Sequence, residues 1–244
     1  MVSGGSGSGK SSLVRAGVLP MLTQPGVIEG IGLWRRAVMT PSMAEGGVFA
    51  SLVSPLCANE AVSEIVSDGT SVDELTAAAM NRSDELCGMV RGALSQAAAL
   101  RLVEEKSKLK ERIENLEGES RLEDAELARK LLADLAAPQA RLALIVDQFE
   151  EIFGEKTSVE DRTKFVALLG SLASSGRVFV IGTMRSDFFP RCAELPTLLR
   201  LTQGEGNFHI APPSPIELGQ MIRQPAQAAG LIFDRLGLFR QLAL

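Results

Sequence analysis

The residues best suited to chemistry lie in one stretch, Gly4-Gly5-Ser6-Gly7-Ser8-Gly9-Lys10-Ser11-Ser12. It fits the spacing G-x-x-x-x-G-K-[ST]. Glycines let successive backbone N–H groups turn inward around an anion. A helix that begins near Lys10 would add its unpaired N–H groups and its positive dipole end. Lys10 would contact the β- and γ-phosphates, and the Ser11 hydroxyl would be a Mg²⁺ ligand. The stretch therefore predicts a phosphate-binding loop.

A flexible Gly/Ser linker or a cloning remnant is the alternative interpretation of this stretch. The sequence that follows favours the phosphate loop, because it provides an apolar helix face: Leu13, Val14, Ala16, Gly17, Val18 and Leu19. A linker has no use for such a face. Only Met1, Val2 and Ser3 precede Gly4, whereas a buried strand of about five residues normally leads into such a loop. We therefore expect a truncated first strand.

An acidic motif follows the uninterrupted apolar run Leu142-Ala143-Leu144-Ile145-Val146. Such a run is typical of a parallel strand that is buried on both faces. It would carry Asp147 to the carboxyl edge of a sheet, where α/β folds bind ligands and where Asp147 could hold Mg²⁺ directly or through water. Glu150 and Glu151 are candidates to orient or deprotonate an attacking water, or else belong to a solvated acidic turn. Together with the glycine-rich stretch, the motif predicts a site for Mg²⁺ and a nucleoside triphosphate.

Arg185 closes the next predicted strand, which starts with Val178-Phe179-Val180-Ile181. It should reach the same edge of the sheet, where an arginine can sense or neutralise a γ-phosphate. A local ion pair with Asp187 or Glu194 is an equally good interpretation. We thus take Glu150, Glu151 and Arg185 as candidate catalytic residues, and Ser11 and Asp147 as candidate metal ligands.

Helices and strands alternate along most of the chain, which predicts a parallel sheet with right-handed crossovers. The first helix should end before Pro20. We expect strands at 33–39, 142–146, 178–181 and 208–210, and helices at 49–57, 161–172 and 196–201. The region 59–136 should be a helical insertion that includes a hairpin of Ser83–Glu117 and Arg121–Ala136. Capping boxes at Ser71 and Ser120 predict two helix starts there.

The sequence changes in character after residue 211, which predicts a core at 1–211 and a partial, truncated helical lid at 212–244. Ser214, Pro215 and Glu217 stand at the N-cap, N1 and N3 positions of a new helix. Pro225 should interrupt that helix, and Gly230 can cap its successor.

Composition excludes several classes of protein. The net charge of −5 and the lack of a basic stripe argue against nucleic-acid binding. No apolar run approaches the roughly 18 residues that a membrane span needs. Cys57, Cys87 and Cys192 are far apart and lack metal-binding spacing, which favours a reduced cytoplasmic setting. His209 is the only histidine, so His-rich metal sites are excluded and a structural role for it is favoured.

Four segments resemble the signal-transduction ATPases with numerous domains, the STAND class, and within it the novel STAND branch often fused to WD-repeat propellers. They are Ser6-Gly7-Ser8-Gly9-Lys10-Ser11-Ser12-Leu13-Val14-Arg15-Ala16-Gly17, Val146-Asp147-Gln148-Phe149-Glu150-Glu151-Ile152-Phe153, Thr183-Met184-Arg185-Ser186-Asp187-Phe188-Phe189 and Gln224-Pro225-Ala226-Gln227-Ala228-Ala229-Gly230-Leu231. The resemblance implies an α/β, AAA+-related three-layer P-loop NTPase fold with strand order 5-1-4-3-2. It also implies that Lys10 binds phosphate, that Ser11 and Asp147 bind Mg²⁺, and that Arg185 is a sensor. Pro225 would belong to the lid.

The resemblance further implies slow ATP hydrolysis that switches an assembly between resting and active forms. The expected cofactors are ATP and Mg²⁺. The expected partners are ATP or ADP, other domains of a longer chain (a winged helix, WD repeats) and further copies in a nucleotide-dependent assembly, with no nucleic acid or membrane. Two alternatives stay open: a turnover enzyme such as a kinase or motor ATPase, and a truncated remnant with impaired nucleotide binding.

Overall fold

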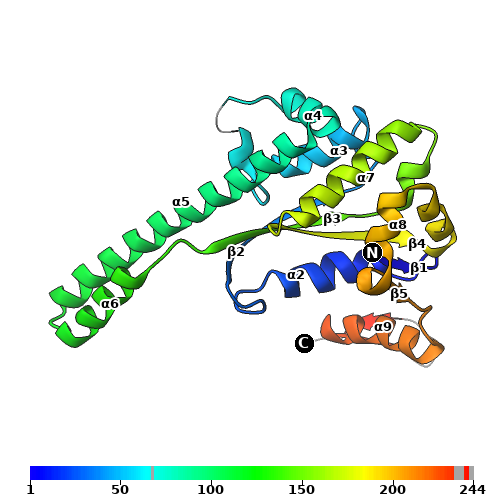
Figure 1. The fold of residues 1–244 in the computed structure, drawn as a ribbon. Coiled ribbons are helices and arrows are strands. Elements are labelled where there is room, and N and C mark those ends of the chain that lie inside the picture. Colours follow the sequence, from blue (N-terminus) through cyan, green and yellow to red (C-terminus); the bar gives the residue numbers. More distant parts are fainter. Residues whose placement is uncertain (67–68, 234–238, 242–244) are drawn as a thin grey trace.

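The computed structural model describes residues 1–66, 69–233 and 239–241, and its centre is a parallel sheet (Figure 1). The strands of this sheet are β1 Val2–Gly4, β2 Ile31–Met39, β3 Gln139–Val146, β4 Val178–Arg185 and β5 Phe208–Ile210. Their order is β2-β3-β4-β1-β5, and all neighbouring pairs are parallel. This is the predicted order 5-1-4-3-2, read from the opposite edge. The predicted fold class is confirmed, including the short first strand.

β3 is the most deeply buried strand because a strand lies on each side of it and both of its faces are covered. Leu142 to Val146 are all fully buried, and they pair with β2 on one side and β4 on the other. Alternate side chains of a strand point to opposite faces. Leu144 therefore packs into the large helical core, whereas Ile145 packs with Val14 beneath the first helix. The uninterrupted apolar run reflects this two-sided burial.

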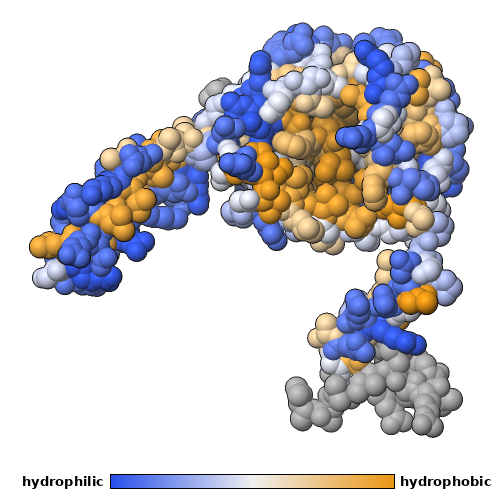
Figure 2. Space-filling model, turned by 60° about the horizontal axis from the view of Figure 1, so that its bottom comes forward, coloured by the Kyte–Doolittle hydropathy of each residue, from blue (hydrophilic) through white to orange (hydrophobic). Residues whose placement is uncertain are grey.

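The two faces of the sheet are covered unequally. One face carries α3 Gly47–Leu56, α4 Val72–Asn81, the first half of α5 Ser83–Gly118 and α7 Val159–Ser174, which together form the main core. The other face carries the helix after the glycine-rich loop (Figure 1). Figure 2 shows this second face as a broad hydrophobic area. Several of its apolar side chains are only partly buried: Val2, Leu22, Trp34, Val38 and Ile181.

The helix after the loop continues past Pro20, so the prediction that it ends before this proline is wrong. It consists of α1 Lys10–Ser12, a π-helical segment η1 Leu13–Val18, and α2 Leu19–Leu22. The N–H of Leu19 donates to Val14 O, five residues back. The helix is widened at that point by this π-helical hydrogen bond. Pro20 then lies in the first turn of α2, where proline is tolerated.

The helical insertion includes a long hairpin of α5 and α6 Leu122–Asp134 that projects from the core (Figure 1). Its distal end has a small core of Ile113, Leu116, Ala125 and Ala128. The capping box at Ser71 is confirmed at the start of α4. Short 3₁₀ helices lie at Ser63–Val66 (η2) and Gly204–Gly206 (η5). Residues 67–68 of the predicted insertion lie outside the described residues.

The predicted capping box at Ser120 is wrong. Ser120 has a positive φ of 59° and lies just after α5 instead of at the start of α6. Its N–H donates to Glu117 O, and the N–H of Arg121 donates to Leu116 O. These two bonds form a Schellman motif, which satisfies the last carbonyls of α5. The turn thus uses Ser120 to end a helix.

The C-terminal part contains α8 Pro196–Thr202 and α9 Pro215–Ala228, followed by the antiparallel pair β6 Leu231–Phe233 and β7 Phe239–Gln241. α9 begins with the predicted capping box of Ser214 and Glu217. It runs through Pro225 instead of stopping there, and Ala229 N–H still donates to Pro225 O. Gly230, with φ of 73°, follows this same helix instead of a successor. Residues 234–238 and 242–244 of the predicted lid lie outside the described residues.

Within the described residues, no helix is both long enough and apolar enough to cross a membrane.

Candidate functional site

The glycine-rich loop connects β1 to α1 at the carboxyl edge of the sheet. Gly7 and Gly9 have φ angles of 74° and 81°, which favour glycine. Gly4 is required for a different reason, because a Cβ there would lie 2.8 Å from Ser8 Oγ and 2.9 Å from the carbonyl oxygen of Ile210. Gly9 is also the N-cap of α1, and its carbonyl accepts from Leu13 N–H at 2.8 Å. The loop backbone is therefore compact and ends in a helix N-terminus.

Lys10 is only 8% exposed, which is unusual for a lysine. Its Nζ donates to the carbonyl oxygens of Gly4 at 3.0 Å and Gly5 at 2.7 Å. The ammonium group is thus held over the loop by main-chain acceptors. Within the part of the chain that the structure describes, the buried Ser8 Oγ has no hydrogen-bond partner. The loop therefore offers a positive charge and an unused hydroxyl at one place.

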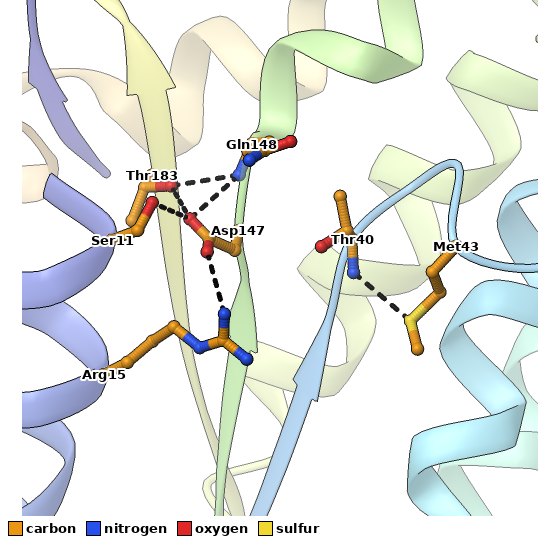
Figure 3. A network of polar contacts seen from close by, with 7 residues as sticks. All are labelled: Ser11, Arg15, Thr40, Met43, Asp147, Gln148 and Thr183. Carbon is orange, nitrogen blue, oxygen red and sulfur yellow. Dashed lines mark hydrogen bonds and ion pairs between the residues drawn. The ribbon is translucent and has the colours of Figure 1, made fainter. Parts of the chain in front are cut away.

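Asp147 follows β3, is 2% exposed and accepts hydrogen bonds from three segments of the chain (Figure 3). Its Oδ1 accepts from Ser11 Oγ at 2.7 Å, from Thr183 Oγ1 at 2.5 Å and from its neighbour Gln148 N at 3.1 Å. Its Oδ2 lies 3.7 Å from an Arg15 guanidinium nitrogen. The structure thus brings the two candidate metal ligands into direct contact, although they are 136 positions apart in sequence.

Sequence reasoning missed Thr183 and Arg15 as parts of this site. Thr183 is a buried hydroxyl residue of β4, and it binds both Asp147 and the N–H of Gln148, at 3.0 Å to the latter. Arg15 lies four residues after Ser11, so both share one side of the helix. Helical spacing could have indicated Arg15. Thr183 was harder to find, because its contact depends on β4 lying beside β3.

The glutamates after Asp147 lie on the 3₁₀ helix η3 Phe149–Phe153, which starts after Gln148 in a left-handed conformation with φ of 53°. Glu150 Oε2 accepts from the N–H of Arg185 at 3.2 Å. Glu151 Oε2 accepts from the backbone N–H of Ser42 at 3.2 Å and from its hydroxyl. Glu150 therefore binds the end of β4, and Glu151 binds the turn that follows β2.

Arg185 forms the local ion pair that was the alternative to a sensor role. Its Nε and one terminal nitrogen donate to the two carboxylate oxygens of Asp187 at 3.0 and 2.6 Å. Its guanidinium carbon lies 5.5 Å from the centre of the Phe188 ring. The hydrogen bond to Asp187 raises the pKa of Arg185, and the same bond lowers the pKa of Asp187. Glu194 pairs instead with Arg191.

These groups surround one open cavity of about 660 Å³. Its size is in the range typical of sites for small molecules and cofactors. Each segment described above contributes to the lining: Ser6, Gly7, Lys10, Ser11, Gln148, Glu150, Glu151, Phe153, Gly154, Thr183, Arg185 and Phe188. The glycine-rich loop, the acidic motif and Arg185 therefore meet at one place.

The donor set suits a phosphate ligand with Mg²⁺ better than a metal held by protein alone. Among the described residues, no group of three or more His, Cys, Asp or Glu side chains could hold a metal ion. Mg²⁺ prefers oxygen ligands and is commonly bound by one or two carboxylates together with substrate phosphates. Ser11 and Asp147 provide a hydroxyl and a carboxylate, and the loop provides the phosphate site.

Comparison with known proteins supports the interpretation of this cavity as the site of an NTPase. Searches of curated proteins and of solved structures give no match. The family model described as Novel STAND NTPase 1 matches residues 1–243, which is nearly the whole chain. The chain is therefore an NTPase module, and it belongs to the Novel STAND NTPase 1 family.

Proposed function

We propose that this chain is an ATP-binding, slowly hydrolysing molecular switch, a module of a larger signalling or scaffold protein. The observation that carries the proposal is the position of Lys10. Its ammonium group donates to the loop carbonyls of Gly4 and Gly5, and Lys10 lines the same cavity as Ser11, which is hydrogen-bonded to Asp147. A phosphate chain and its cation need such a positive group and such ligands at one site.

In the proposed bound state, Lys10 exchanges its two carbonyl acceptors for β- and γ-phosphate oxygens. Charge-assisted hydrogen bonds to phosphate are stronger than bonds to neutral carbonyls, so the exchange is favourable. The loop N–H groups and the N-terminus of α1 bind the remaining phosphate oxygens. Gly7 and Gly9 add no side chains to this surface, and their positive φ angles favour glycine.

Ser11 and Asp147 would hold Mg²⁺, the hydroxyl directly and the carboxylate directly or through water. When bound, Mg²⁺ would neutralise charge that develops on the phosphates. Thr183 donates to Asp147 Oδ1 and therefore fixes the orientation of the carboxylate. Arg15 partly compensates the charge of the buried Asp147.

Slow hydrolysis follows from the positions of the glutamates. Glu150 and Glu151 face the cavity, but each carboxylate accepts a backbone N–H, from Arg185 and Ser42 respectively. These bonds hold each side chain against the backbone through its Oε2 atom. One glutamate would have to turn toward an attacking water before it could take a proton from it. We assign that catalytic role to one of these two residues.

Several parts of the proposal rest on the family: that the base is adenine, that the partners are a winged helix or WD repeats, and that assembly depends on nucleotide. The cytoplasmic setting is also part of the proposal, and the free thiols of Cys57, Cys87 and Cys192 agree with it. Nucleotide would act as a switch because a ligand shifts a conformational equilibrium only through contacts that differ between states. The γ-phosphate contacts of Lys10 and Arg185 would provide that difference.

Binding and turnover measurements on the same sample test the proposal. We expect calorimetric titration to show Mg²⁺-dependent binding of ATPγS, and phosphate release from ATP below about 0.01 per second, well under the rates of about 1–100 per second typical of kinases. Absence of nucleotide binding would contradict the proposal. Turnover within the kinase range would instead indicate a turnover enzyme on the same fold.

A further inference from the structure

Asp187 stands out among the charged groups near the cavity because it is not part of the sequence motif for phosphate binding and yet engages Arg185. Two parallel hydrogen bonds join its carboxylate to the guanidinium group, at 3.0 and 2.6 Å. This is the bidentate geometry with which arginine also binds phosphate. Asp187 occupies the edge of the guanidinium that is formed by Nε and one terminal nitrogen. Arg185 cannot present this edge to a γ-phosphate while the ion pair lasts.

The surroundings allow Arg185 to move from one partner to the other. The side chains of Arg185 and Asp187 are 43% and 55% exposed, and ion pairs at such positions contribute little to stability. The backbone of Arg185 is held separately, through its N–H to Glu150. Phe188 lines the cavity and lies against the guanidinium. The side chain can thus rotate while its attachment point and one flat surface stay in place.

Asp187 is also within electrostatic reach of the phosphate loop. Its pKa is lowered mainly by the hydrogen bond from Arg185, and Lys10 adds a smaller effect in the same direction. The negative charge of Asp187 therefore also acts on bound phosphates of every kind. Competition for Arg185, in contrast, concerns only a ligand that has a γ-phosphate.

We propose that Asp187 is a positioning residue that sets the discrimination between nucleoside triphosphate and diphosphate. It retains Arg185 when the γ-phosphate position is empty, and it releases Arg185 to a triphosphate. This inference rests on the proposed nucleotide-binding function. Asp187 lowers the affinity for triphosphate, because a γ-phosphate can bind the Nε edge of Arg185 only after the ion pair breaks. The site is thereby biased toward the diphosphate state, as a switch with a stable resting form requires.

The test compares D187N with wild type by calorimetric titration of Mg·ATPγS and Mg·ADP. The substitution keeps the shape of the side chain and removes its charge. We expect the ratio of ATPγS affinity to ADP affinity to rise about two- to fivefold, the range that corresponds to loss of an exposed ion pair. E194Q is the matched control, because Glu194 forms the same bidentate pair with Arg191 on the same segment, Ser186–Glu194. It should leave the ratio unchanged.

A double variant, R185M/D187N, separates competition from simple repulsion. If Asp187 acts through Arg185, the gain in the ratio disappears in the double variant. Equal gains for ATPγS and ADP in D187N would overturn the inference, because they indicate general repulsion only. An unchanged ratio in D187N, with melting temperature preserved, would overturn it as well. Failure of wild type to bind either nucleotide would overturn the proposed function and this inference together. Binding by wild type, with the same affinity ratio in D187N, would contradict the inference alone.

Discussion

The carboxyl edge of the sheet and the distal hairpin of α5 and α6 are built in opposite ways. At the sheet edge, Ser11, Asp147 and Thr183 are far apart in sequence and meet only because β3, β4 and β1 are consecutive strands of the sheet. In the hairpin, most ion pairs join residues three or four positions apart, and a few buried side chains form the distal core. The edge depends on the whole fold, whereas the hairpin depends on local sequence.

Burial separates the two regions as clearly as sequence distance does. Asp147 is 2% exposed and each donor that it accepts has a defined position. The charges of these hairpin ion pairs are exposed, and exposed ion pairs contribute little to stability. A substitution at the edge should therefore change nucleotide binding strongly, and a comparable substitution in the hairpin should not change it.

The largest expected effect is that of Lys10→Ala. Removal of the ammonium group eliminates the charge-assisted bonds to phosphate, and we expect affinity for Mg·ATPγS to fall by a factor of about 100 or more. Lys110→Ala, on an exposed part of α5, is the control and should bind like wild type. Calorimetric titration measures both. Equal affinities of the two variants would break the distinction between the regions.

Asp147→Asn should have the next largest effect, and a selective one. The amide keeps the side-chain volume but loses the charge that attracts Mg²⁺, so we expect the gain in ATPγS affinity on adding Mg²⁺ to shrink about tenfold or more. Binding in the presence of EDTA should change far less. Asp124→Asn, which removes an exposed hairpin carboxylate paired with Arg121, should preserve the full Mg²⁺ effect.

The strands of the central sheet were predictable from sequence, whereas several contacts of the site were not. The run Leu142 to Val146 indicated a strand buried on both faces, and the glycine spacing indicated the loop. Thr183 was missed because nothing in a single sequence states which strands are neighbours. The first helix continues past Pro20 through a π-helical segment, although proline usually ends a helix. Ser120 ends α5 in a Schellman motif, although serine before Glu123 is typical of a helix start.

A smaller effect is expected for Thr183→Val. The substitution conserves shape and removes the hydroxyl that orients Asp147 and accepts from Gln148 N–H. Asp147 Oδ1 and Gln148 N–H keep other partners, so the expected cost is that of lost hydrogen bonds, about 1 kcal/mol in the free energy of unfolding measured with urea. Thr163→Val is the control, because the Thr163 hydroxyl makes an exposed bond within α7. A cost for Thr163→Val as large as that for Thr183→Val would contradict the importance of the edge contacts.

The smallest effect on nucleotide binding is expected for Ile113→Ala. Ile113 belongs to the distal core of the hairpin, so its truncation should open that end of α5 and α6 locally. Hydrogen exchange should increase at the end of the hairpin, and affinity for Mg·ATPγS should stay within about twofold of wild type. A large loss of affinity would show that the hairpin and the sheet edge are coupled.

Replacing Mg²⁺ with Mn²⁺ tests whether Lys10 and Asp147 serve one cation and one triphosphate. Electron paramagnetic resonance reports Mn²⁺ that is immobilised on the protein. We predict that wild type immobilises Mn²⁺ strongly only when ATPγS is present, and that K10A and D147N each weaken this joint binding. Immobilisation of Mn·ATPγS by D147N to the same extent as by wild type would contradict a role of Asp147 in holding the cation.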